Sequence, residues 1–264
     1  MNNIENTITS IANEKAKRIR ALAQKKNRDA EKVFVVEGAE HLQKALANGW
    51  QVETLLHIDS KPVPQEILRL CKAQNTAIYA VNEKVASYAT NRDNAQALVG
   101  VVRQRYQQIG VAAQAKTGVW LGLENVRDSG NLGSIIRSAD AVAVQGILLI
   151  GNCCDAFAPE VIRATTGSFS AVPLVRISTI DFVNWRSSFA GKIIGTHLHE
   201  KAVDYRQAKL AQPVIILMGG EQAGLSAELT AVCDVLVKIP MREGVESLNL
   251  AVSTAIIIYE LVKH

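Results

Sequence analysis

The sequence predicts an α/β protein with a parallel sheet in its C-terminal part, preceded by a smaller α/β domain. Short apolar runs alternate with amphipathic stretches along most of the 264 residues, which is the pattern of helices packed on a sheet. After residue 118 the strand-like runs are almost continuously apolar, as in parallel strands covered on both faces. Between the two regions, residues 103–118 are polar and lose the alternation, which indicates a linker.

The first 32 residues are predicted to form a basic helical arm. They hold eight basic and four acidic side chains, so they account for the whole net charge of +4. Ile11, Ile19 and Leu22 recur at near-helical spacing, which favours an amphipathic helix. A basic segment on a neutral body suggests binding to a polyanion, although a solvated helix with surplus lysines is an equal alternative. The candidate contacts are Lys15, Arg18, Lys25, Lys26 and Arg28.

Residues 33–102 alternate regularly and are predicted to form the first α/β domain. The expected strands are Val33–Val36, Val52–Ile58, Ala77–Val81 and Ala97–Val102. The expected helices are Ala39–Ala47, Pro64–Ala73 and Glu83–Tyr88.

The second domain is predicted over residues 119–264. Its expected strands are Val119–Leu123, Ile147–Ile150, Lys192–Thr196, Val214–Met218 and Val235–Ile239. A last helix is expected from Ser247, as N-cap, to the C-terminus. One stripe on this helix is apolar and must pack on the sheet or on another subunit. It consists of Leu248, Val252, Ala255, Tyr259 and Val262.

Composition excludes several classes of protein. No apolar run is long enough for a transmembrane helix, and the polar N-terminus lacks the apolar core of a secretory signal. The four cysteines show no metal-binding spacing, so we expect reduced thiols, a cytoplasmic protein and no metal. The pair His197 and His199 is interpreted as incidental.

Three segments directly follow predicted strands, where ligands bind in open α/β sheets. They are residues 124–137, 219–225 and 239–249. Gly219 and Gly220 allow backbone groups to approach a ligand closely. No Lys follows Gly224, so the second segment is not a P-loop. A GxGxxG motif is also missing, which argues against a dinucleotide-dependent oxidoreductase.

Together these segments resemble the signatures of the SpoU (TrmH-like) family of RNA 2′-O-methyltransferases, in the SPOUT superfamily. The matching residues are Asn131, Gly133, Ile135 and Arg137 in the first segment; Gly219, Glu221, Gly224 and Leu225 in the second; and Ile239, Pro240, Met241, Ser247, Leu248 and Asn249 in the third. In the first domain, Phe34, Glu37 and Gly38 match a signature of the family's larger members. Departures are Gly220 for Asn, Gln222-Ala223 for Gly-Lys, and Thr165 for Ser.

The resemblance implies a catalytic domain with a trefoil knot that binds S-adenosylmethionine, in a homodimer. The implied cofactor contacts are Thr196, Leu217, Gly219, Glu221, Ile239, Met241 and Leu248. Arg137 is the implied activator of the ribose hydroxyl, with Asn131, Glu221, Ser247 and Asn249 orienting the reactants. A guanidinium is a poor base, so we favour electrostatic stabilisation of the forming alkoxide, with a general-base role as the alternative.

The substrate implied is structured RNA. A separate N-terminal domain favours 23S-type ribosomal RNA, and transfer RNA is the alternative. Only 5% of residues are aromatic, which favours recognition of shape and phosphates over stacking on bases. Arg163 is a further candidate for RNA contact. A non-catalytic RNA-binding protein on the same fold would be expected to lose Arg137 and the cofactor loop, and both are present.

Overall fold

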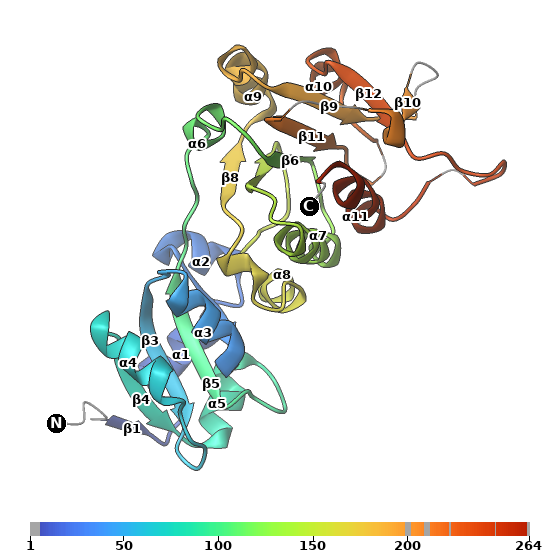
Figure 1. The fold of residues 1–264 in the computed structure, drawn as a ribbon. Coiled ribbons are helices and arrows are strands. Elements are labelled where there is room, and N and C mark those ends of the chain that lie inside the picture. The colour runs from blue at the N-terminus through green and yellow to red at the C-terminus, as the bar shows by residue number, and fades with distance from the viewer. Residues whose placement is uncertain (1–5, 199–201, 209–211, 222, 246, 263–264) are drawn as a thin grey trace. The chain divides into compact units, whose positions relative to one another are not determined.

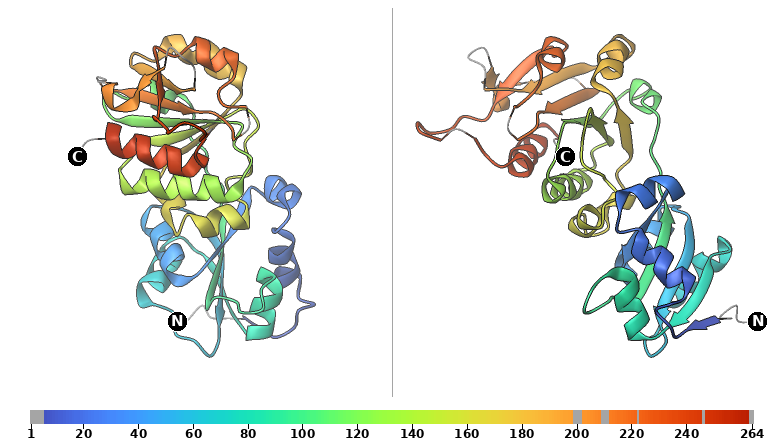
Figure 2. Two further views of the ribbon diagram at one scale, coloured as in Figure 1. Left: turned by 90° about the vertical axis from the view of Figure 1, so that its right-hand side faces the viewer. Right: turned by 180° about the vertical axis from the view of Figure 1, so that it is seen from behind.

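The computed structural model describes residues 6–198, 202–208, 212–221, 223–245 and 247–262. The chain forms two compact units (Figures 1 and 2), and each contains one sheet with helices. The predicted α/β architecture is therefore confirmed. The division differs from the expected one, because residues 155–171 leave the second unit and join the first.

The first unit is built on a five-stranded mixed sheet of order β1-β4-β3-β5-β2. The strands are β1 (Asn6–Ile8), β2 (Val33–Glu37), β3 (Val52–Ile58), β4 (Ala77–Val81) and β5 (Leu98–Arg103). Strand β5 runs antiparallel to its neighbours β2 and β3, and the other pairs are parallel. The helices are α1 (Glu14–Ala21), α2 (Lys25–Glu31), α3 (Ala39–Ala47), α4 (Gln65–Ala73), α5 (Glu83–Thr90) and α8 (Pro159–Ala164). The strands and helices expected over residues 33–102 are all present, and no bound differs from the expected one by more than two residues.

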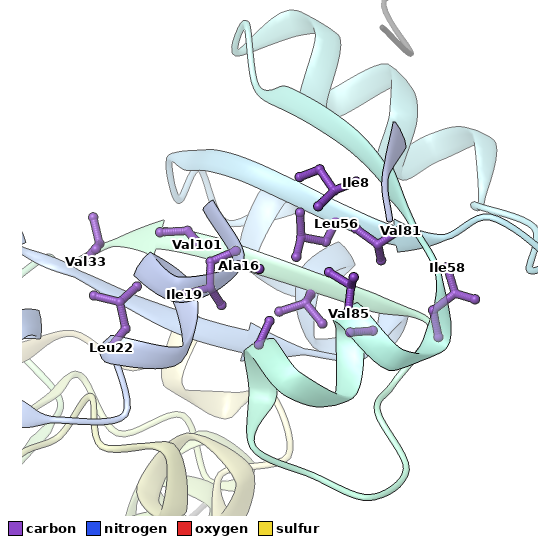
Figure 3. Packing of buried hydrophobic residues seen from close by; sticks show 13 residues of the cluster. Ile8, Ala16, Ile19, Leu22, Val33, Leu56, Ile58, Val81, Val85 and Val101 are labelled. Atoms are coloured by element: carbon purple, nitrogen blue, oxygen red, sulfur yellow. The ribbon is translucent and has the colours of Figure 1, made fainter. Parts of the chain in front are cut away.

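The N-terminal segment is part of this unit, so the expectation of a separate arm was wrong. Strand β1 pairs with β4, Asn6 with Tyr79 and Ile8 with Val81. Ala16, Ile19 and Leu22 are buried in one cluster with residues of β3, β5 and α5 (Figure 3). Ile19 and Leu22 of the predicted spacing therefore lie where α1 packs on the sheet, whereas Ile11 precedes α1 and is exposed.

Residues 155–171 are fixed to the first unit by an aromatic cluster and by polar contacts. Phe157 and Phe169 pack against Phe34, with ring centroids 4.6 and 5.6 Å away. Trp50 lies beside both rings and donates its indole N–H to the backbone oxygen of Ser170 at 3.0 Å. The segment therefore supplies core side chains to the first unit.

The second unit is built on a seven-stranded sheet of order β10-β12-β9-β11-β6-β7-β8, in which every pairing is parallel. The strands are β6 (Val119–Glu124), β7 (Gly146–Ile150), β8 (Leu174–Ile177), β9 (Lys192–Thr196), β10 (Val203–Asp204), β11 (Val214–Met218) and β12 (Val235–Lys238). The five expected strands are confirmed, and β8 and β10 are additional. Strands β6, β7 and β11 are buried throughout, which explains their continuously apolar sequences.

Helices cover both faces of this sheet. They are α6 (Gly110–Ala113), α7 (Ser129–Ala141), α9 (Thr179–Trp185), α10 (Ala227–Ala231) and α11 (Leu250–Leu261). Helices α7 and α11 lie side by side on one face, and α9 and α10 lie on the other (Figures 1 and 2). No described helix combines the length and apolar character needed to cross a membrane.

Two local expectations need correction. The predicted linker, residues 103–118, contains α6, whose Ala112 is fully buried, and Gln107 forms a bridge with Val175 of β8. Helix α11 is capped by Asn249, whose side-chain oxygen accepts hydrogen bonds from the backbone N–H groups of Ala251 and Val252. Ser247 is therefore not the N-cap, which lies two residues later than expected.

Candidate active site

The second unit contains a pocket of about 710 Å³ at the carboxyl ends of β9, β11 and β12. This volume lies within the range of small-molecule sites. Three segments line it, one following each strand. The lining residues are Thr196, His197 and Leu198; Met218, Gly219, Gly220, Glu221, Ala223 and Gly224; and Val237, Lys238, Ile239, Met241, Ser247, Leu248, Asn249, Leu250, Ser253 and Ile257.

The loop after β11 is tight because of its glycines. A Cβ on Gly219 would lie 1.9 Å from the backbone carbon of Gly224, so no side chain fits there. Gly224 has a φ of 66° and donates its N–H to the oxygen of Gly220 at 3.0 Å. The loop thus closes on itself and places its backbone, and the side chain of Glu221, on the pocket wall.

Asn131 connects the three sequence motifs. Its side-chain NH₂ donates to the Glu221 carboxylate at 3.0 Å, and its side-chain oxygen accepts from the NH₂ of Asn249 at 2.9 Å. Asn131 is 9% exposed, so these bonds are largely shielded from water. The amide of Asn249 also caps α11, and this explains an Asn at a position where the sequence alone gave no reason for one.

Two carboxylates fix the loops that carry these residues. Asp128 caps α7 by accepting the backbone N–H of Asn131 at 2.7 Å. Glu124, at the end of β6, is 2% exposed and accepts the backbone N–H of Ser226 at 2.8 Å. The glycine loop is therefore held from the neighbouring strand. Glu124 was not among the predicted site residues, because an acidic residue that ends a strand gives no sign in the sequence of its distant partner.

Most residues expected to contact a cofactor do line the pocket. Leu217 is the exception, because its side chain is buried in the core between the sheet and α9. Its backbone oxygen accepts a hydrogen bond from the Thr196 hydroxyl at 3.0 Å. His197, Leu198, Lys238 and Ser253 line the pocket without having been predicted. The available signal for His197 and Leu198 was their position directly after β9.

Arg137 lies away from this pocket. It is exposed on α7 and is not among the lining residues. Arg137 follows buried Asn131 by six residues, which places the two side chains about 120° apart around the helix axis. Within one chain, the structure therefore brings together Asn131, Glu221, Ser247 and Asn249 but leaves Arg137 on another face.

All the residues expected to contact RNA belong to the first unit, and carboxylates neutralise several of them. Arg18 is paired with Glu31 and Glu53. Lys25 is paired with Asp29, and Arg163 with Glu37 and Glu160. Lys15 lies over the ring of Tyr79 at 5.1 Å, and Lys26 is exposed.

Arg28 was wrongly expected to contact RNA. Its side chain is 3% exposed and forms an ion pair with Asp155 at 2.7 Å. It also donates to the backbone oxygens of Leu22 and Ala23. A guanidinium with this burial and these partners is not available to a phosphate, so Arg28 joins residues 155–171 to the N-terminal helices.

Among the described residues, no three His, Cys, Asp or Glu side chains gather as a metal site. His199 of the expected incidental pair lies outside the described residues, as does Gln222 of the glycine loop.

Comparison with known families gives two matches that together cover most of the chain. Residues 118–259 match the SpoU rRNA Methylase family. Residues 13–100 match the MRM3-like substrate binding domain. The second match begins before β2, in agreement with the packing of α1 and α2 into the first unit.

Individual proteins resemble the chain over nearly its whole length. The crystal structure of AdoMet-bound rRNA methyltransferase from Sinorhizobium meliloti is 40% identical, with a TM-score of 0.90 and 97% of each chain covered. The SpoU methyltransferase AviRb from Streptomyces viridochromogenes, in complex with AdoMet, is 29% identical, with a TM-score of 0.81 and coverage of 95% of this chain and 97% of that one. The 23S rRNA (guanosine(2553)-2′-O)-methyltransferase RlmP of Bacillus subtilis is 28% identical over 96% of this chain and 98% of its own.

Proposed function

The chain belongs to the SpoU rRNA methylase family, and we propose that it transfers a methyl group from S-adenosylmethionine to a ribose 2′-hydroxyl of ribosomal RNA. The observation that carries this proposal is the hydrogen-bonded chain Glu221–Asn131–Asn249 beside the pocket. It joins residues from all three family motifs into one site.

The pocket fits S-adenosylmethionine in size and chemistry. Apolar side chains of Ile239, Met241 and Leu248 can hold the adenine, and the Gly219–Gly220 backbone can approach the cofactor without Cβ obstruction. Glu221 supplies a negative charge that suits the cofactor's cationic end. When bound, the cofactor supplies an electrophilic methyl group with a neutral thioether as leaving group, so the protein's task is to align and activate the ribose oxygen.

We assign that activation to Arg137. Within the described part of the chain it makes no ion pair or hydrogen bond with another side chain. A charged guanidinium stabilises the oxyanion that develops on the ribose and can hold the adjacent phosphate at the same time. Glu221, Asn131, Ser247 and Asn249 then act by positioning the cofactor and the ribose.

A homodimer completes this assignment. Part of the predicted stripe remains open to solvent: Val252 and Tyr259 of α11 are 49 and 59% exposed, and Leu248, just before the helix, is 39% exposed. An exposed apolar stripe of this kind indicates a protein interface. In a symmetric dimer, the stripe of each chain is buried against the same stripe of the other chain. Because Arg137 does not line its own pocket, the second copy also provides the Arg137 that the site requires. The trefoil knot remains part of this proposal.

Ribosomal RNA is the preferred substrate. Two relatives that cover both units are named as 23S rRNA methyltransferases, from B. subtilis and S. viridochromogenes. Other relatives carry names that include transfer RNA, so transfer RNA is the alternative. We place the reaction in the cytoplasm, in keeping with four free cysteines.

The test is methyl transfer from labelled S-adenosylmethionine to protein-free 23S ribosomal RNA, with total transfer RNA in parallel. We expect label in ribosomal RNA, at a position that resists alkaline cleavage because its 2′-oxygen is blocked. Label in transfer RNA alone would show that transfer RNA, and not ribosomal RNA, is the substrate. Cofactor binding without transfer to either RNA would contradict the enzymatic proposal.

A further inference from the structure

Arg127 and Arg176 of the second unit are exposed, and like Arg137 they have no carboxylate partner among the described residues. Arg127 lies in the segment between β6 and α7, and Arg176 lies on the edge strand β8. In the described part of the chain, neither side chain forms an ion pair or a hydrogen bond. This distinguishes them from Arg18, Lys25 and Arg163 in the first unit, which are neutralised by carboxylates.

The sheet register places both arginines at the carboxyl edge of the second sheet. Glu124 of β6 lies opposite Ile150 of β7, which lies opposite Ile177 of β8. Arg127 comes three residues after Glu124, the last residue of β6, and Arg176 comes one residue before Ile177 on β8. The cofactor pocket lies at the same edge, because the strands are parallel and the pocket lies at the carboxyl ends of β9, β11 and β12.

Side-chain alternation shows which face Arg176 occupies. Val175 is buried in the cluster that contains Phe182 of α9 and Leu229 of α10. Successive side chains of a strand point to opposite faces, so Arg176 points to the face that carries α7 and α11 (Figure 2). Arg127 leads directly into α7, the helix that carries Asn131 and Arg137.

A buried thiol lies close enough to both arginines to be affected by their charges. Cys153 donates its S–H to the backbone oxygens of Leu123 and Ile150, the ends of β6 and β7. Burial raises the pKa of this thiol, while nearby backbone N–H groups and the charges of Arg176 and Arg127 oppose the rise. The charges of Arg127 and Arg176 therefore both act on the Cys153 thiol, at the carboxyl end of the sheet.

We propose that Arg127 and Arg176 bind phosphates of the substrate RNA strand next to the methylated nucleotide. This inference rests on the proposed function. Exposed guanidinium groups without carboxylate partners are suited to phosphate, since binding need not break an existing ion pair. Their place at the carboxyl edge extends the pocket into a track for the RNA backbone. These contacts set the register of the strand, and they carry no base specificity of their own.

The experiment uses the full chain with Arg127→Gln, Arg176→Gln and the double variant. RNA affinity is measured against salt concentration with a 23S ribosomal RNA transcript, and KM, kcat and S-adenosylmethionine affinity are measured separately. The matched control is Lys116→Gln. Lys116 is likewise exposed and unpaired among the described residues, but it precedes β6 at the opposite edge of the sheet.

Each arginine variant should lower the slope of log affinity against log salt by about 0.7–0.9. The double variant should bind the RNA roughly tenfold more weakly at low salt and raise KM for RNA, with kcat and cofactor affinity unchanged. The control should retain the wild-type slope. An unchanged slope and KM in the double variant would overturn the inference, and so would a loss confined to kcat. If the wild type binds this RNA but methylates none, the proposed function fails, while the slopes still decide whether the arginines hold phosphates.

Discussion

The side-chain amide of Asn131 donates a hydrogen bond to the carboxylate of Glu221 across 3.0 Å, although 90 residues separate the two in sequence. The other end of the same amide is bound by Asn249. A single side chain thus sets the positions of the glycine loop and of the first turn of α11. Its orientation is fixed by chemistry, because only the NH₂ group can face a carboxylate.

Asn131→Asp should therefore damage the site more than Asn131→Ala. The first variant places a second carboxylate against Glu221, and the second only removes the hydrogen bonds. We expect S-adenosylmethionine affinity to fall about tenfold or more at pH 8 in Asn131→Asp, from repulsion between like charges. Repulsion raises the pKa of the carboxyl pair, so binding should recover as the pH falls and one proton is taken up. Calorimetry at several pH values is the measurement, and a pH-independent loss equal to that of Asn131→Ala would contradict this account.

Arg137→Ala should abolish turnover while leaving cofactor binding intact. The side chain does not line its own pocket, so S-adenosylmethionine affinity should change by less than about twofold, whereas kcat should fall by about a hundredfold or more. Arg137→Lys should not restore activity, because an ammonium cannot span hydroxyl and phosphate as a planar guanidinium can. Near-normal turnover in Arg137→Ala would remove Arg137 from the reaction.

Mixing two inactive variants should restore activity if Arg137 acts across a dimer. Arg137→Ala lacks the activator, and Gly219→Val blocks the pocket wall where a Cβ meets backbone. In a heterodimer one of the two sites then has both an intact pocket and an intact arginine. Random mixing should restore about a quarter of the wild-type sites. Differently tagged chains allow the heterodimer to be purified, and an inactive heterodimer would show that each site uses its own arginine.

Val252→Glu should convert the dimer into a monomer. Val252 is 49% exposed in the middle of the apolar stripe of α11, and burying an unpaired carboxylate at an interface is costly. Ile180→Glu is the control, since Ile180 is 73% exposed on α9, across the sheet from α11. Light scattering should give the mass of one chain for the first variant and of two for the second. A wild-type protein with the mass of one chain would refute the dimer.

Arg28→Met should destabilise the first unit without changing the salt dependence of RNA binding. It leaves the carboxylate of Asp155 buried and unpaired, which typically costs about 3–5 kcal/mol. Urea unfolding measures the loss, and adding Asp155→Asn should recover part of it. Lys26→Met, at an exposed neighbour, should leave stability nearly unchanged. If Arg28→Met were as stable as the wild type, the ion pair would have no role in holding residues 155–171.

Much of the fold could be predicted because the main strands show in the sequence. Strands such as Val214–Met218 are buried on both faces, so their apolar runs are continuous. Strand β1 was missed because its three residues, Asn6–Ile8, include two polar ones. Strand β8 was missed because Arg176 interrupts its apolar run at an exposed edge position.

The site residues could be predicted from motifs, but their arrangement could not. Glu221, Ser247 and Asn249 were expected together and do share a pocket. Sequence could not separate Ser247 from Asn249 as the N-cap because Ser and Asn are equally good caps, whereas the structure shows the Asn249 side chain bound to the N–H groups of Ala251 and Val252. Arg28 was expected in solvent because its partner Asp155 lies 127 residues away.

Residues 155–171 belong to the first unit although they lie between two strands of the second, and this affects how chimaeric proteins can be built from the two units. The substrate unit is encoded in two separate stretches, so a graft cut once at the polar stretch near residue 104 would leave behind the rings of Phe157 and Phe169 that complete its core. A fragment starting at residue 119 would in turn carry those rings without Phe34 and Trp50 to cover them. Chimaeras that exchange RNA specificity within this family should therefore carry the loop between β7 and β8 together with the N-terminal hundred residues.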